Sequence, residues 1–167
     1  MKRGITVIRY KQLLTLKVLD KDTKEPVGKI EEIICSDDYK RVEYLIIKND
    51  NLIKNKAIIK YEDILFLNNN QVVYTKDVKQ LEERLERNIS SEKEGARLFN
   101  KDIKDENGEF VGFIRDIVID KDDGKIDGFI ITEGVFEDII KGRNYLPLLD
   151  NVIIDEEAIK IKSNILS

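Results

Sequence analysis

Short apolar segments alternate with polar turns along this chain, and their spacing predicts β-strands. The first three predicted strands are residues 16–20, 27–36 and 41–48, with polar turns between them. Residues 57–61 form a fourth predicted strand, and a hairpin follows around three consecutive asparagines at 68–70. Strands at intervals of about 8 to 12 residues are typical of an antiparallel barrel or sandwich.

The pattern occurs twice. The motif Val-Gly-x-Ile-x-x-Ile stands at residues 27–33 and again at 111–117, 84 positions later, and the two copies match without a gap from Lys17 and Lys101 to Asp50 and Gly134. We therefore interpret the chain as a tandem duplication of a unit of about 70 residues. A unit of that size is marginally stable alone, so packing one copy against the other would help.

The apolar residues of the repeated motif cannot all face one side of a regular strand. In a regular strand Val27 and Ile33 point to one face, whereas Ile30 points to the other. Because the same spacing recurs in both copies, we predict a β-bulge near residues 31–32 and 115–116 that lets all three apolar side chains face inward. The alternative is that both faces of this strand are covered.

Glycines mark the predicted bends and turns. Gly28 and Gly112 are expected where the strand bends or another backbone comes close. The pairs at residues 107–108 and 123–124 are Asn-Gly and Asp-Gly, which are strong hairpin signals.

Residues 77–89 do not show the hydrophobic pattern of a strand, because Val78, Leu81, Leu85 and Ile89 recur at helical spacing. We predict an amphipathic helix there, followed by a polar, flexible joint up to residue 95.

An insertion distinguishes the second copy from the first. It holds four apolar residues that would share one face of a short helical turn. They are Val135, Phe136, Ile139 and Ile140. This turn either plugs the end of its own barrel or, if exposed, forms a docking surface for a partner.

The segments at residues 104–117 and 146–152 resemble the PRC-barrel family, with its Val-Gly-x-Ile-x-Asp-Ile and Pro-x-x-Asp-type motifs. The first copy has Lys60 in place of the proline and Glu32 in place of the aspartate. The resemblance implies a mainly β fold of two tandem, small, six-stranded antiparallel β-barrels joined by one α-helix. It also implies an adaptor module, since the barrel is not known as an enzyme fold.

The resulting division places the first barrel domain at residues 1–76, the linker helix and joint at 77–95, and the second barrel domain at 96–167.

Composition is that of a globular protein, with 41% hydrophobic and 37% charged residues. No apolar run reaches the roughly 18 residues of a membrane span, and charges near the start oppose a signal peptide. We therefore expect a cytoplasmic protein. Residues 1–75 contain 14 basic against 11 acidic residues, and the remainder 15 against 22, so the two halves should attract each other weakly.

Candidate chemistry is sparse. The chain has no histidine and one cysteine, Cys35, so neither a zinc site nor a Cys-His nucleophile can be assembled within it. Cys35 is expected to be a buried small hydrophobe. The acidic run at 120–124 has its glycine in the wrong place for an EF-hand, so we interpret it as a hairpin turn. We expect no cofactor, no metal and no enzymatic activity; a hydrolase built on carboxylates is the least favoured class.

The favoured function is protein binding, and a second copy of this chain is one candidate partner. The alternative is RNA or ribosome-assembly binding through basic residues near the start of the chain, where Tyr10 would stack on a base. These basic residues are Lys2, Arg3, Arg9, Lys11 and Lys17.

Overall fold

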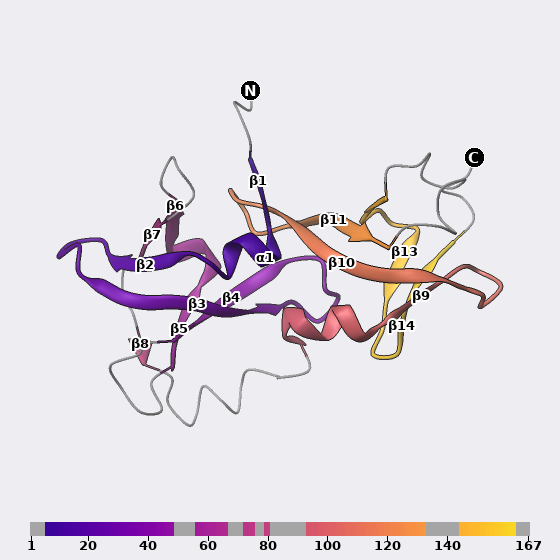
Figure 1. Cartoon of the computed structure of the whole chain (residues 1–167), viewed down its shortest axis with the longest axis horizontal. Helices are drawn as coiled ribbons and strands as arrows, with labels where there is room; N and C mark the ends of the chain where they lie inside the picture. The colour runs from indigo at the N-terminus through magenta and orange to yellow at the C-terminus, as the bar shows by residue number, and fades with distance from the viewer. Residues whose placement is uncertain are drawn as a thin grey trace.

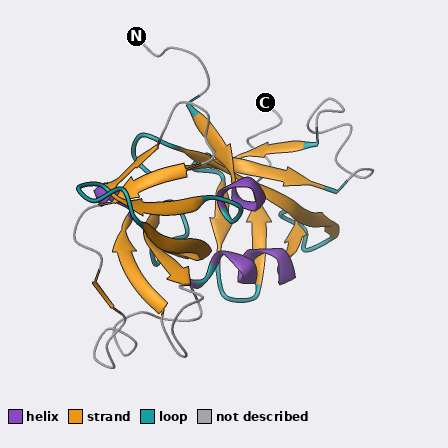
Figure 2. Ribbon diagram, turned by 60° about the vertical axis from the view of Figure 1, so that its left-hand side comes forward, coloured by secondary structure: helices purple, strands orange, loops and turns teal. Residues whose placement is uncertain are grey.

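The computed structural model of the protein describes residues 6–48, 56–66, 72–75, 79–80, 93–132 and 144–162. Strands make up most of these residues, and the helical segments are short (Figures 1 and 2). The prediction of a mainly β fold is confirmed.

The first repeat supplies one seven-stranded sheet among the described residues, in the order β6-β7-β2-β3-β4-β5-β8. A 3-10 turn, η1 (Tyr61–Asp63), connects β5 to β6. The strands are β2 (Lys17–Asp20), β3 (Pro26–Cys35), β4 (Val42–Lys48), β5 (Lys56–Lys60), β6 (Ile64–Phe66), β7 (Val72–Thr75) and β8 (Lys79–Gln80).

The second repeat supplies the other seven-stranded sheet, in the order β12-β11-β10-β9-β14-β13, and β1 (Val7–Arg9) from the start of the chain pairs with β10. A short helix precedes each repeat: α1 (Tyr10–Leu13) and the 3-10 helix η3 (Gly95–Asn100). The strands are β9 (Asp102–Lys104), β10 (Phe110–Asp120), β11 (Ile126–Ile131), β12 (Tyr145–Pro147), β13 (Val152–Ile154) and β14 (Ala158–Ile161).

The long strands β3 and β10 carry the repeated motif. The ladder from β3 to β4 shifts between Ile30 and Glu32, and the ladder from β10 to β11 shifts between Ile114 and Asp116. The extra residue resets the alternation, so that Ile30 is 1% exposed and Ile114 is 4% exposed. The predicted β-bulge is therefore confirmed in both repeats.

Gly28 lies where β3 passes close to β4. A Cβ atom at this position would collide with the carbonyl oxygen of Lys48 and would lie 2.9 Å from Cγ2 of Ile47. The predicted close approach of another backbone is confirmed here. The hairpin glycines also behave as predicted, since Gly108 has φ +81° and Gly124 has φ +78°, values that favour glycine.

Strand pairing departs from the expected antiparallel pattern at one place in each repeat. β2 pairs with β7 in parallel, and β9 pairs with β14 in parallel. In the first repeat the reason is η1, which turns the chain through a corner between β5 and β6. The hairpin β6–β7 then returns beside β2 in the same direction.

The segment before each repeat crosses to the other repeat. Ile8 of β1 pairs with Ile119 of β10, and Glu94 forms an isolated bridge with Ile34 of β3. As a result α1 packs against β10, and η3 packs against β3 as well as β10, in the middle of the molecule (Figure 1). No sequence pattern indicates this exchange.

The junction between the repeats has approximate two-fold symmetry. The backbone N–H of Val42 donates to the carbonyl of Gly124, and the N–H of Ile126 donates to the carbonyl of Lys40, each at 2.8 Å. Val42 and Ile126 are 84 positions apart, as are Lys40 and Gly124. Each contact is thus matched by its counterpart, as in an isologous dimer interface. Most buried apolar side chains of both repeats form one continuous cluster, and Ile34, Ile46 and Ile58 form a second, smaller one.

A carboxylate on each long strand caps the helix that crosses over from the other repeat. Oδ1 of Asp116 accepts the backbone N–H of Lys11 in α1 at 3.1 Å and that of Ile117 at 2.9 Å. Glu32 accepts the N–H of Ile33 and also that of Ala96 in η3. Both helix starts lack a cap from their own N-cap side chain, so these carboxylates satisfy donors that would otherwise be unpaired.

Two predictions in the linker need correction. The structure describes only Lys79 and Gln80 of the predicted helix, and they form β8, because they pair with Ala57 and Ile58 along the edge of β5. The helical prediction is wrong for these two residues; the rest of 77–89 lies outside the described residues. The predicted flexible joint is also wrong where it is described, because Gly95 is buried against Ile33 and Tyr10.

Candidate functional site

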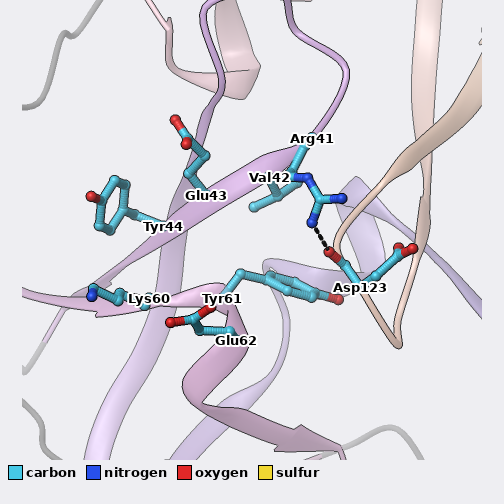
Figure 3. A pocket seen from close by; sticks show the side chains of 8 residues that line it. All are labelled: Arg41, Val42, Glu43, Tyr44, Lys60, Tyr61, Glu62 and Asp123. Carbon is cyan, nitrogen blue, oxygen red and sulfur yellow. Dashed lines mark hydrogen bonds between the residues drawn. The ribbon is translucent and has the colours of Figure 1, made fainter.

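A cleft of about 230 Å³ lies at the junction of the repeats (Figure 3). It is lined by β4, β5 and η1 of the first repeat and by the β10–β11 turn of the second. Its lining residues are Arg41, Val42, Glu43, Tyr44, Lys60, Tyr61, Glu62 and Asp123.

The polar groups at one end of this cleft hold the repeats together. Nη1 of Arg41 donates to the carbonyl oxygen of Asp123 at 2.8 Å, as Figure 3 shows. The buried hydroxyl of Tyr61 donates to the carbonyl of Lys121 at 3.1 Å, and burial raises the pKa of Tyr61. Glu43 and Glu62 are exposed, so water solvates their carboxylates. The cleft is thus a joint between the repeats.

The remaining candidate chemistry also has a structural explanation. Cys35 is 2% exposed, and burial raises the pKa of its thiol to about 12, which makes it an inert core residue as predicted. In the acidic run, Oδ1 of Asp120 accepts the N–H of Asp122 at 2.8 Å, and Oδ1 of Asp123 accepts the N–H of Lys125 at 2.8 Å. These are turn contacts, and the predicted hairpin is confirmed. Among the described residues no group of three acidic, cysteine or histidine side chains could hold a metal ion.

Tyr10 is not available to stack on a base. It is 5% exposed, and its hydroxyl donates to Oε1 of Glu32 at 2.7 Å. Burial and this bond raise the pKa of Tyr10, and burial raises the pKa of Glu32. The part of the RNA hypothesis that depends on Tyr10 is therefore wrong.

The described basic residues around Tyr10 lie on different elements. Arg9 lies on β1, which belongs to the sheet of the second repeat, whereas Lys17 lies on β2 of the first. Lys11 lies near the ring of Phe99, with its Nζ 5.6 Å from the ring centroid. Lys2 and Arg3 lie outside the described residues.

Aromatic side chains are exposed on the outer face of the second sheet. Phe110 is 47% exposed and Phe113 is 43% exposed, and their rings meet edge to face with centroids 4.9 Å apart. The two residues are three positions apart, and they reach the same face because the ladder from β10 to β9 shifts between Phe110 and Gly112. The bulge thus creates an aromatic pair that water contacts.

The aromatic pair continues into a row across four strands. Phe110 on β10 lies opposite Lys104 on β9, which lies opposite Lys160 on β14, which lies opposite Ile153 on β13. Residues directly opposite each other in a ladder share a face of the sheet. Ile153 is 43% exposed, and Nζ of Lys160 lies 3.3 Å from Oδ2 of Asp155. We call the surface made by Phe110, Phe113, Ile153, Lys104 and Lys160 the aromatic face.

The family model for the PRC-barrel domain matches the chain twice, at residues 5–79 and 91–165. The chain belongs to the PRC-barrel family. PRC-barrel domains are interaction and binding modules, so the question for this protein is which surface binds and what it binds. A search of curated proteins finds no match to this chain. Among the described residues no helix is long and apolar enough to cross a membrane.

The two PRC-barrel repeats differ at the aromatic face. Both motif glycines occupy the same ladder position, with Gly28 opposite Val18 and Gly112 opposite Ile103. By this register, Phe110 and Phe113 of the second repeat correspond to Pro26 and Lys29 of the first. The exposed aromatic pair is therefore not required by the PRC-barrel fold.

Sequence reasoning missed this surface, because an aromatic residue in an apolar strand is normally interpreted as core. The available signal was the difference between the copies at these two positions. The partner-binding residues proposed from sequence, Val135, Phe136, Ile139 and Ile140, lie outside the described residues.

Proposed function

We propose that the protein is a non-enzymatic adaptor whose second repeat binds a protein partner through the aromatic face. The observation that carries the proposal is the pair Phe110–Phe113, two large apolar side chains that remain exposed on a regular sheet. Covering a half-exposed phenylalanine ring gains about 1 kcal/mol, and aromatic residues are enriched at the centres of protein interfaces.

The lysines of the aromatic face indicate the chemistry of the partner. Lys104 and Lys160 lie directly opposite each other, between Phe110 at one end and Ile153 at the other. Within the described residues, Lys104 has no ion-pair partner, so a carboxylate placed over it would gain charge complementarity. Asp102 lies on the same face, directly opposite Phe113, so the partner's carboxylate is expected over Lys104 and not beside Phe113. The fitting partner is therefore a segment that presents apolar side chains and an aspartate or glutamate placed to reach Lys104.

The absence of catalytic function is part of this proposal. It is supported by the junction cleft, where the buried Tyr61 and the exposed Arg41 both donate to backbone carbonyls, and by the buried, inert thiol of Cys35.

Peptide display tests the proposal. A random peptide library is selected on the immobilised wild-type protein and on the double variant F110S/F113S. Wild type should enrich peptides that combine aromatic or aliphatic residues with acidic ones, and the double variant should not. Leu65, an exposed leucine of the first repeat at 52% exposure, provides the matched control L65S, which should enrich the same peptides as wild type.

Thermal unfolding of each variant first confirms that its fold is intact. Enrichment of the same acidic-apolar peptides by F110S/F113S would contradict the proposal, as would enrichment of basic peptides by the wild type.

A further inference from the structure

Four lysines stand side by side on the first sheet, one on each of four neighbouring strands. Lys17 on β2 lies opposite Lys29 on β3, Lys29 lies opposite Lys48 on β4, and Lys48 lies opposite Lys56 on β5. All four are exposed. Because opposite residues share a face and neighbouring strands are about 4.8 Å apart, their stems form a straight line about 14 Å long. We call this line the lysine row.

The lysine row lowers the stability of the first sheet, because like charges directly opposite each other in a ladder repel. One carboxylate offsets part of the repulsion: Oε2 of Glu31, the bulge residue of β3, lies 3.2 Å from Nζ of Lys56. The described residues provide no ion-pair partner for Lys17, Lys29 or Lys48. The centre of the row therefore presents positive charge that the described residues leave unneutralised.

The middle of the row is hollowed. Lys29 and Lys48 line a concavity of about 450 Å³ together with Leu14, Ile30 and Glu31. An anionic group that enters this hollow would lie beside the Lys29 and Lys48 side chains and beside Glu31, whose carboxylate is paired with Lys56.

The fold does not require this arrangement, as the second repeat shows. At the corresponding ladder positions it has Asp102 on β9 opposite Phe113 on β10. Thr132, which follows β11, exchanges hydrogen bonds with Phe113. No lysine occupies any of these three positions, so the lysine row belongs to the first repeat alone.

We propose that the lysine row binds the phosphodiester backbone of single-stranded nucleic acid. Such a strand carries one negative charge per nucleotide, so several successive phosphates can meet the row at once. The row contains lysine only, and the ammonium group contacts phosphate oxygens as a point charge. The row holds no aromatic ring for stacking on bases, so the contact does not depend on sequence. This inference is independent of the aromatic face.

Fluorescence anisotropy with the full-length protein tests the inference. The probes are fluorescein-labelled 20-nucleotide oligo(U) and oligo(dT), titrated at 50, 100 and 200 mM NaCl. Both should bind equally well, with affinity that falls with salt at a log-log slope of about −2 to −3, as expected for three or four phosphate contacts.

Substitution at the centre of the row gives the specific readout. K29Q/K48Q should weaken binding about ten-fold or more at 100 mM NaCl and reduce the slope by about 1.4. The matched control is K40Q/K125Q, which removes the same charge from two exposed lysines outside the row and should leave affinity within about two-fold of wild type. All four substitutions are at exposed positions, and thermal unfolding verifies that the variants remain folded.

Several results would overturn the inference. One is the absence of salt-dependent binding by wild type. The others are an equal loss of affinity in both double variants and a more than ten-fold difference in affinity between oligo(U) and oligo(dT). Displacement of the oligonucleotide by an equal concentration of polyglutamate would also overturn it, because it would assign the row to acidic proteins.

Discussion

At the scale of single residues, Asp116 and Glu32 show how surroundings decide a role. Each is the acidic residue of the repeated motif, and in an exposed strand each would be an ordinary solvated carboxylate. Here Asp116 is 7% exposed and accepts two backbone N–H groups, one of them from the helix that enters from the other repeat. The motif aspartate thus links the repeats, a role that no sequence pattern indicates because its donor lies 105 positions away.

Replacing Asp116 tests this role. D116A leaves the N–H groups of Lys11 and Ile117 without their acceptor, and we expect the free energy of unfolding to fall by about 1 to 3 kcal/mol. D116N keeps an Oδ1 acceptor and should lose clearly less. Urea denaturation measures both values, and equal stability of D116A and wild type would show that the cap contributes nothing.

At the scale of elements, the predictions that succeeded depend on local spacing. Ile30 and Ile114 revealed the bulges because strand parity is a property of neighbouring residues. The positions of β1 and β8 could not be predicted, because strands of three and two residues carry too little pattern to select a partner. The lysine row was equally hidden, since its members become neighbours only through pairing of four separate strands.

A glycine substitution tests how tightly β3 and β4 approach. G28A places a methyl group against the Lys48 carbonyl, a rigid neighbour, and should cost about 3 kcal/mol of unfolding free energy. G108A is the matched control, because no atom lies within 4 Å of its added Cβ and only the positive φ is strained; it should cost about 1 kcal/mol. Equal losses of unfolding free energy in G28A and G108A, measured by chemical denaturation, would show that the close contact at Gly28 adds no cost.

At the scale of the whole molecule, we expect the two repeats to unfold as one cooperative unit. The segment that precedes each repeat pairs with the sheet of the other repeat, and the main buried cluster includes Leu45 of the first repeat and Phe129 of the second. The sequence predicted the duplication correctly, but spacing alone could not show that the copies complete each other, because the crossing segments precede the motif.

Core substitutions in either repeat should therefore destabilise both. We expect L45A and F129A each to lower the unfolding free energy by about 3 to 5 kcal/mol while unfolding remains a single transition. Hydrogen exchange followed by mass spectrometry checks this, since peptides from both sheets should lose protection together in each variant. Protection lost only in the substituted repeat would mean that the repeats unfold independently.

The matched contacts across the junction have a consequence for how such a molecule can change. In a pair of identical subunits every substitution appears on both, so a charged strip gained by one is imposed on its twin. Joining the halves in a single chain removes that constraint while keeping the symmetric joint. One half can then gain ammonium groups while the other gains aromatic rings, and a scaffold with two equal sides becomes one with two different sides.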